Sequence, residues 1–255
     1  MMEVVLKIEK LEVGYKNKAI LSPITVNTHT NEMICIVGRN GQGKSTIIKT
    51  LCKLLKPISG NIFIKNIHLD KITDKQFSKL VSVVLTQKIN INHTLVDDFI
   101  AFGRYPFTNW LGTINENDRI IISEAMNLCG ISHLKGKNFN DLSDGEKQKV
   151  NIARAIAQET PVILLDEPTA HLDLANNFET FKLLKKISKE CGKSVIFSTH
   201  HIESALQLAD QIWIVNNSNF YSNTPSNCIQ SGEIDKLFTN TAVKYNRERN
   251  LFEFD

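Results

Sequence analysis

A glycine-rich segment, GRNGQGKST at residues 38–46, constrains the fold more than any other feature of the sequence. It matches the pattern G-x-x-x-x-G-K-[ST], which joins a β-strand to an α-helix in phosphate-binding loops. The flanks fit that context, because the apolar run Met33–Val37 precedes the segment and Ser45–Leu55 has apolar residues at helical spacing up to Pro57. The segment therefore predicts a phosphate site on an α/β fold.

The chemistry of this loop is direct. Glycines let backbone N–H groups approach phosphate oxygens, and the helix N-terminus adds positive potential. We expect Lys44 to reach the β- and γ-phosphates and the Ser45 hydroxyl to ligate Mg²⁺. The nucleotide-binding residues expected from the loop are Gly38, Arg39, Asn40, Gly41, Gln42, Gly43, Lys44, Ser45 and Thr46.

A second segment, VILLDEP at residues 162–168, reads as a buried strand that ends in two carboxylates. Neighbouring strand residues point to opposite faces, so Asp166 and Glu167 can have different tasks. Asp166 suits the Mg²⁺ shell, and Glu167 suits a water molecule positioned for attack. Beside the phosphate loop, this pair indicates hydrolysis of a nucleoside triphosphate.

The rest of the chain indicates strand–helix alternation with one interruption. Alternating apolar residues predict a short antiparallel sheet near the N-terminus, and the texture between about 88 and 141 predicts a helical insertion with an aromatic-rich segment, GRYPFTNWLG. The tail from Asn216 reads as turn-rich with a short amphipathic stretch near Ile234–Phe238. Further strands are expected at 4–8, 61–65, 80–86, 162–165, 194–198 and 211–215, and further helices at 95–102, 118–128, 176–190 and after 202.

Composition excludes several classes. The chain has 255 residues, 42% of them hydrophobic, which is enough for a sizeable core. Its net charge of +3 gives no argument for nucleic acid, and no apolar run reaches the roughly 20 residues of a membrane helix. The five cysteines are scattered without a Cys-x-x-Cys pair, which favours reduced thiols in a cytosolic protein.

A third segment adds a family resemblance. LSDGEKQ at residues 142–148 resembles the signature motif of ABC-transporter ATPases, whose usual form is LSGGQ. The order of motifs also agrees, from the phosphate loop through Gln87, the signature and LLDEPTA to His200 after VIFST. The resemblance implies an ABC-type P-loop NTPase: a mixed sheet core at about 1–87 and 142–240, an antiparallel β subdomain, and the helical insertion at 88–141, all in a single domain.

The resemblance also implies roles for individual residues. Tyr15 matches the aromatic residue that stacks on adenine, and Gln87 matches the glutamine that contacts Mg²⁺ and the attacking water. His200 matches the histidine that senses the γ-phosphate, and Asp173 matches an aspartate that crosses a dimer interface. Two copies would then enclose two ATP molecules, with Ser143 and Gly145 of one copy touching the nucleotide of the other.

The signature departs from the usual form at Asp144 and Glu146, where carboxylates should repel a triphosphate. A capping box explains both, since Ser143 can cap the following helix while Glu146 reaches back to the N–H of Ser143. Asp144 then lies in the first turn, where the helix dipole favours negative charge. We expect the signature to remain competent.

The insertion narrows the resemblance further. HTLVDDFIAFGRYPFTNWLG at 93–112 is similar to the ATPases of importers for iron–siderophore, haem and cobalamin complexes. This implies an ATPase at the cytoplasmic face of the cell membrane, acting with separate permease subunits, a substrate-binding protein and no nucleic acid. Alternatives are an exporter ATPase, an ABC ATPase of DNA maintenance or translation, and a nucleotide-binding module without catalysis.

Overall fold

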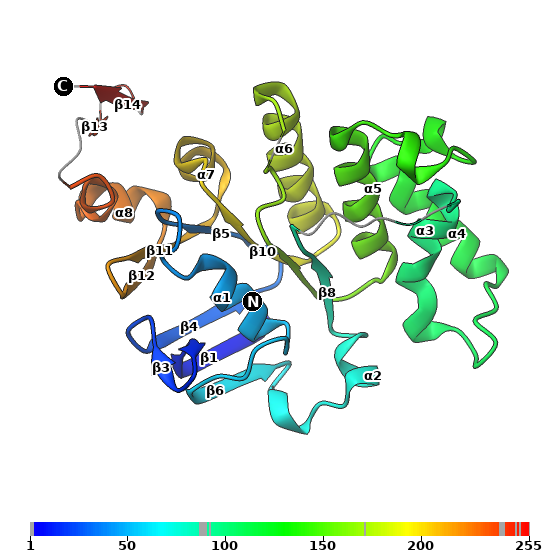
Figure 1. Cartoon of the computed structure of the whole chain (residues 1–255), viewed down its shortest axis with the longest axis horizontal. Coiled ribbons are helices and arrows are strands. Elements are labelled where there is room, and N and C mark those ends of the chain that lie inside the picture. Colours follow the sequence, from blue (N-terminus) through cyan, green and yellow to red (C-terminus); the bar gives the residue numbers. More distant parts are fainter. Residues whose placement is uncertain are drawn as a thin grey trace.

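A mostly parallel sheet forms the centre of the molecule (Figure 1). The structure is a computed structural model that describes residues 3–86, 91, 93–170, 172–239, 243–247, 249 and 251–254. In this part of the chain the sheet has the strand order β12-β11-β5-β10-β9-β8, and only β12 runs antiparallel to its neighbour. The strands are β5 (Met33–Val37), β8 (Val81–Val84), β9 (Val162–Leu165), β10 (Ser194–Thr199), β11 (Gln211–Asn216) and β12 (Asn219–Asn223).

Both faces of the central sheet are covered. Every residue of β5, β9 and β10 is buried, as expected for parallel strands between two layers. The apolar side chains form two clusters. One contains α1 (Lys44–Leu51) and the N-terminal sheet, and the other contains α6 (Leu174–Glu190), α7 (Ile202–Leu208) and the helical layer.

The predicted antiparallel sheet near the N-terminus is confirmed. Its order is β4-β1-β6-β7, and each pair is antiparallel. A two-residue ladder, β2 with β3, lies beside it in the sequence and carries Tyr15. The elements of this region are β1 (Val4–Glu12), β2 (Gly14–Tyr15), β3 (Lys18–Ala19), β4 (Ile24–His29), β6 (Ser59–Ile64), β7 (Ile67–His68), η1 (Leu69–Lys71) and α2 (Asp74–Phe77).

The helical layer stands at one side of the sheet (Figure 1). It extends beyond residue 141, because α5 (Asp144–Ala157) packs against α3 (Val96–Ala101) and α4 (Glu116–Leu128). Arg104 ties the layer together, since its buried guanidinium donates to Asp118 at 2.8 Å, to the Ala157 carbonyl at 2.7 Å and to Glu159 at 2.7 Å. The short 3₁₀ segments are η2 (Phe102–Phe107), η3 (Ser132–Leu134) and η4 (Phe139–Asp141).

Several boundaries differ from the sequence-based predictions, and two of the differences have a clear physical cause. The helix expected to reach Leu55 ends at Leu51, because Lys53 adopts a left-handed conformation (φ 61°) and the Leu54 N–H turns back to the Lys49 carbonyl at 2.9 Å. The strand expected over 80–86 covers only Val81–Val84. Beyond Val84, the Thr86 hydroxyl bonds the Asp166 carbonyl at 2.8 Å instead of continuing the ladder.

The tail contains more regular structure than its turn-rich sequence predicts. Asn217 and Ser218 both have positive φ, which closes a tight hairpin between β11 and β12. The helix α9 matches the expected amphipathic stretch. The tail elements after β12 are α8 (Pro225–Gln230), α9 (Glu233–Lys236), β13 (Val243–Asn246) and β14 (Leu251–Phe254). Among the described residues, no helix is long and apolar enough to span a membrane.

Candidate functional site

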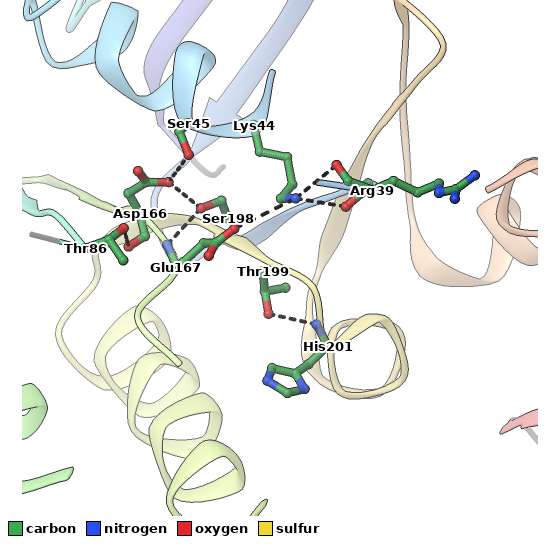
Figure 2. Close-up of polar contacts among 10 residues, drawn as sticks. Arg39, Lys44, Ser45, Thr86, Asp166, Glu167, Ser198, Thr199 and His201 are labelled. Atoms are coloured by element: carbon green, nitrogen blue, oxygen red, sulfur yellow. Dashed lines mark hydrogen bonds and ion pairs between the residues drawn. The ribbon is translucent and has the colours of Figure 1, made fainter. Parts of the chain in front are cut away.

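The loops after β5, β9 and β10 meet at one edge of the central sheet, because parallel strands all end there (Figure 2). A pocket of about 300 Å³ opens between them. Its lining residues are Asn40, Gly41, Gly43, Lys44, Ser45, Thr46 and Glu167. Glu167, one of the two predicted carboxylates, thus lines the same pocket as the phosphate loop.

The loop between β5 and α1 has the predicted strand–loop–helix context. Gly43 is the N-cap residue of α1, and its φ of 106° lies in the left-handed region that favours glycine. A Cβ atom on Gly38 would collide with the carbonyl oxygen of Val215 on the neighbouring strand. The pattern therefore reflects backbone geometry at both ends of the loop.

Lys44 is held under the loop, with 4% of its side chain exposed. Its Nζ atom donates to the carbonyl oxygens of Gly38 at 2.9 Å and Arg39 at 3.3 Å, and lies 3.9 Å from Oε1 of Glu167. Burial lowers the pKa of Lys44, while the carboxylates of Glu167 and Asp166 act in the opposite direction. Neutral carbonyl partners leave the ammonium available to an incoming phosphate group.

Asp166 is buried, and its Oδ1 atom accepts hydrogen bonds from two hydroxyl groups. Ser45 donates to it from α1 at 2.9 Å, and Ser198 donates from β10 at 2.7 Å. Carboxylate and hydroxyl oxygens are ligands that Mg²⁺ accepts, so Ser45 and Asp166 fit this ion. No cluster of three or more His, Cys, Asp or Glu able to hold a metal occurs in the described ranges.

The side chains of Glu167 and Asp166 point to different partners. Its carboxylate faces Lys44 across the pocket, and its backbone N–H donates to Ser198 Oγ at 2.8 Å. The cause differs from the predicted strand alternation, because Glu167 has left strand geometry and adopts a φ of 47°. A positive φ outside glycine is uncommon, and such backbone strain is concentrated at functional sites.

The two histidines after β10 have different positions. His200 follows the strand end and is exposed, and His201 is the N-cap residue of α7. Their ring centroids lie 4.1 Å apart, and the His201 N–H donates to Thr199 Oγ1 at 3.1 Å. His200 is therefore at the same sheet edge as Asp166 and Glu167.

Other predicted residues lie at the margin of the pocket. Tyr15, 49% exposed, has its hydroxyl 3.4 Å from Thr46 Oγ1, so its ring stands beside the loop with a face open to a ligand. The side chain of Arg39 turns away from Lys44 in Figure 2. Gln42 accepts a hydrogen bond from the Asn217 N–H at 2.9 Å. Arg39 and Gln42 therefore contribute to the loop through their backbone atoms, since their side chains are directed elsewhere. Gln87 lies outside the described residues.

The predicted capping box is confirmed at the start of α5. The Ser143 N–H donates to Glu146 Oε2 at 2.9 Å, and the Glu146 N–H donates to Ser143 Oγ at 3.3 Å. These backbone and hydroxyl bonds from Ser143 lower the pKa of Glu146. Asp144 is exposed in the first helical turn.

The signature residues meet the start of α6 rather than the pocket. A Cβ atom on Gly145 would lie 3.1 Å from Asn176 Oδ1, and Asp173 caps α6 through the Asn176 N–H at 2.8 Å. Neither Ser143, Gly145 nor Asp173 is among the described residues that line the pocket. The residues predicted to bind one nucleotide therefore lie in two separate groups of one chain, the phosphate pocket and the signature face.

Sequence reasoning missed Ser198, which joins the two carboxylate residues. The available signal was a hydroxyl residue directly after the apolar run VIF, two positions before the predicted histidine. Thr86 was also missed, because its hydrogen bond to the Asp166 carbonyl depends on the pairing of β8 with β9.

Comparison with known proteins agrees with this geometry. The sequence model of the ABC transporter family matches residues 21–170. The chain belongs to the ABC transporter family. It has the ABC-type P-loop NTPase fold and is an ATP-binding ATPase domain of that family.

Individual relatives and solved structures are similar to this ABC ATPase over most of its length. It is 30% identical over 204 residues to the iron(3+)-hydroxamate import ATP-binding protein FhuC of Bacillus subtilis, covering 80% of this chain and 76% of that protein. It resembles a solved metal-chelate type ABC transporter in an inward-facing conformation with a TM-score of 0.82 and 25% identity, over 98% of this chain and 96% of that one. A dimeric ATP-binding cassette with ADP and phosphate gives a TM-score of 0.73 at 25% identity, over 86% and 98% of the two chains.

Proposed function

We propose that this ABC ATPase powers the import of a metal chelate through a separate membrane permease. An iron–siderophore complex is the first choice of cargo, and haem or cobalamin comes next. The observation that carries the proposal is the likeness to an iron(3+)-hydroxamate import protein and to a metal-chelate type transporter over most of the chain. The aromatic-rich insertion supports the same subgroup.

An exposed apolar segment supports a protein partner for the helical layer. Trp110 is 91% exposed and Leu111 is 67% exposed, and Tyr105 and Phe107 lie on the same segment. Contiguous apolar surface of this kind marks interaction sites. Arg104 connects the segment to α4 and to the end of α5, so a permease that presses on it would move the signature helix.

The division of the predicted nucleotide-binding residues into two groups supports a dimer of this chain. Residues Gly38–Thr46 of one copy would bind ATP, and Ser143 and Gly145 of the second copy would close over its terminal phosphate. Asp173 would lie at the interface, because Gly145 packs against Asn176, whose side chain is hydrogen-bonded to Asp173 in the same chain. The dimeric cassette that holds ADP and phosphate shows that related chains assemble as dimers.

Within that dimer each residue of the pocket has a task. Lys44 would exchange its bonds to Gly38 and Arg39 for bonds to phosphate oxygens, and Tyr15 would stack on adenine. Glu167 would orient the attacking water and accept its proton, while His200 would donate to the terminal phosphate.

Mg²⁺ would be held by Ser45, Asp166 and Gln87 together with the nucleotide, and it would offset the negative charge of the phosphates. The hydroxyl of Ser198 would keep the Asp166 carboxylate oriented toward Ser45. The same hydroxyl holds the backbone of Glu167, so one side chain aligns both acidic residues.

The proposed place of the ATPase is the cytoplasmic face of the cell membrane. The permease would be a separate chain, and a substrate-binding protein would deliver the chelate on the opposite side. Nucleic acid has no part in this proposal, because the net charge of the chain is only +3.

The test is an uptake assay in the organism that carries this chain. Its gene is deleted, and uptake of labelled ferric hydroxamate, ferric catecholate, haem and cobalamin is measured separately. We expect one of the four uptakes to be lost, to return with the wild-type chain and not to return with Glu167→Gln. Unchanged uptake of all four would overturn the proposed cargo class, while leaving the ATPase assignment intact.

A further inference from the structure

His201 occupies the N-cap position of α7 but makes no capping hydrogen bond with its side chain. The ring reaches across to α6 instead, where its Nε2 atom lies 3.1 Å from Nδ2 of Asn177. The same Nδ2 atom donates to the carbonyl oxygen of Leu172 at 3.3 Å. Asn177 is 5% exposed, so this contact is a built feature of the interior rather than a surface encounter.

The Leu172 carbonyl decides the protonation of His201. A carbonyl can only accept, so the amide of Asn177 must direct its NH₂ group toward Leu172, and it directs the same group toward the ring. Nε2 of His201 then has to accept, which requires a neutral ring with its proton on Nδ1. The arrangement leaves Oδ1 of Asn177 buried without a partner among the described residues, a cost that the fold retains.

The contact joins two loops of the ATPase site. Leu172 directly precedes Asp173, which caps α6 beside the signature residue Gly145. The ring of His201 is also packed on His200, with centroids 4.1 Å apart. His201 therefore stands between the histidine expected at the terminal phosphate and the loop expected at the dimer interface.

We propose that His201 is a positioning residue that, through Asn177, fixes the loop carrying Asp173 relative to His200. Both groups then reach a nucleotide at the dimer interface in one geometry. This inference rests on the ATP-enclosing dimer proposed above.

Protonation of His201 would break the link, because an N–H on Nε2 would face the NH₂ group of Asn177. Burial lowers the pKa of His201 below its ordinary value of 6.5; His200 lowers it further, and the carboxylate of Glu167 acts in the opposite direction. His200 and Glu167 are the titratable groups that act on the ring within the described residues. The link is therefore intact at neutral pH and is lost below pH 6.5.

The first test reads the tautomer directly. Long-range ¹H–¹⁵N NMR on the full chain should show His201 as the Nδ1–H form at pH 7.5. Asn177→Ala removes the donor that stabilises the neutral ring, so the pKa of His201 should rise. An Nε2–H form in the wild-type chain would overturn the proposal, because Nε2 would then donate rather than accept.

The second test separates positioning from stability. His201→Gln places a non-titrating amide oxygen within reach of Asn177, and His133→Gln alters an exposed histidine of the helical layer as the control. We expect His201→Gln to lose the fall in kcat on acidification below pH 6.5, while KM for ATP and the thermal midpoint stay at wild-type values. Asn177→Ala should lower kcat about three- to tenfold at pH 7.5, the range of one hydrogen bond, with KM unchanged.

If kcat falls with acid to the same extent in His201→Gln and in His133→Gln, the proposed role of His201 is overturned. ATP-dependent dimerisation of Glu167→Gln, measured in parallel, keeps the two proposals apart. A failure to dimerise would overturn the proposed dimer. A normal dimer, together with an unchanged acid dependence of kcat in His201→Gln, would overturn only the inference about His201.

Discussion

The hydroxyl of Ser45 donates to Oδ1 of Asp166 at 2.9 Å, which joins the first turn of α1 to the end of β9 across 121 positions of sequence. The contact places the serine of the phosphate loop against the first of the two acidic residues. It explains why the loop and the carboxylates act as one site although they are distant in the chain.

Ser198 gives the first prediction, because its hydroxyl serves both acidic residues. In Ser198→Ala the part-buried N–H of Glu167 loses its acceptor and the buried Asp166 carboxylate loses a donor, which should cost about 1–3 kcal/mol of unfolding free energy. We also expect kcat to fall about tenfold, since Glu167 is no longer held. Ser198→Thr retains the hydroxyl and is the matched control. Chemical denaturation and steady-state ATPase assays measure both effects, and wild-type values of both in Ser198→Ala would contradict this role.

Lys44→Ala should weaken ATP binding about ten- to a hundredfold, because the ammonium supplies charged hydrogen bonds to the phosphates. Hydrolysis should be lost as well. Lys49→Ala, on the same helix but in its last turn, is the control and should bind ATP normally. Isothermal titration calorimetry of the two variants decides the matter, and tight binding by Lys44→Ala would reduce the glycine-rich loop to a helix cap.

The capping box predicts the behaviour of Asp144. Asp144→Gly restores the common form of the signature but removes a favourable dipole interaction of about 0.3–1 kcal/mol and adds backbone freedom. We expect a lower thermal midpoint and no gain in ATPase rate. A severalfold rate increase at unchanged stability would mean that the Asp144 carboxylate repels the nucleotide.

Stability should fall with acid through Asp210. Burial raises its pKa, but bonds from Lys185 at 2.7 Å, from the Met33 N–H at 2.8 Å and from Lys189 at 3.0 Å outweigh burial and lower the pKa below 3.8. Because the folded pKa is below the unfolded one, this contribution is present above pH 3.8 and is lost as pH falls through the folded value. Urea midpoints between pH 7 and pH 3 should fall less steeply in Asp210→Asn than in the wild type. Parallel curves would contradict the assignment.

Local motifs made much of the site predictable. The phosphate loop and the capping box each depend on residues within a few positions of one another, so their spacing dictates their backbone. The end of α1 escaped prediction because apolar spacing continues to Leu55 while Lys53 turns into a left-handed conformation. The strand β12 was missed because the signals for its turn, Asn217 and Ser218, read only as a loop.

Contacts that depend on strand order could not be predicted from the sequence. Ser198 meets Asp166 only because β10 lies beside β9, and Asn177 meets His201 only because α6 packs near the start of α7. The orientation of the Arg39 side chain is a similar case. The loop pattern predicts the course of its backbone, whereas the direction of the guanidinium, away from Lys44, is visible only in the structure.

The most direct test of the account is the mass of Glu167→Gln in solution with and without ATP. Loss of the carboxylate that activates water typically costs 10²–10⁴-fold in rate, so this variant should bind ATP and retain it. Sedimentation of Glu167→Gln should show a monomer without nucleotide or with ADP, and a dimer with ATP. The double variant Glu167→Gln, Ser143→Arg should stay monomeric with ATP. Two results together would contradict the account: Glu167→Gln stays monomeric with ATP bound, and the wild-type ATPase rate per chain is independent of protein concentration. The chain would then contain a complete site in one copy.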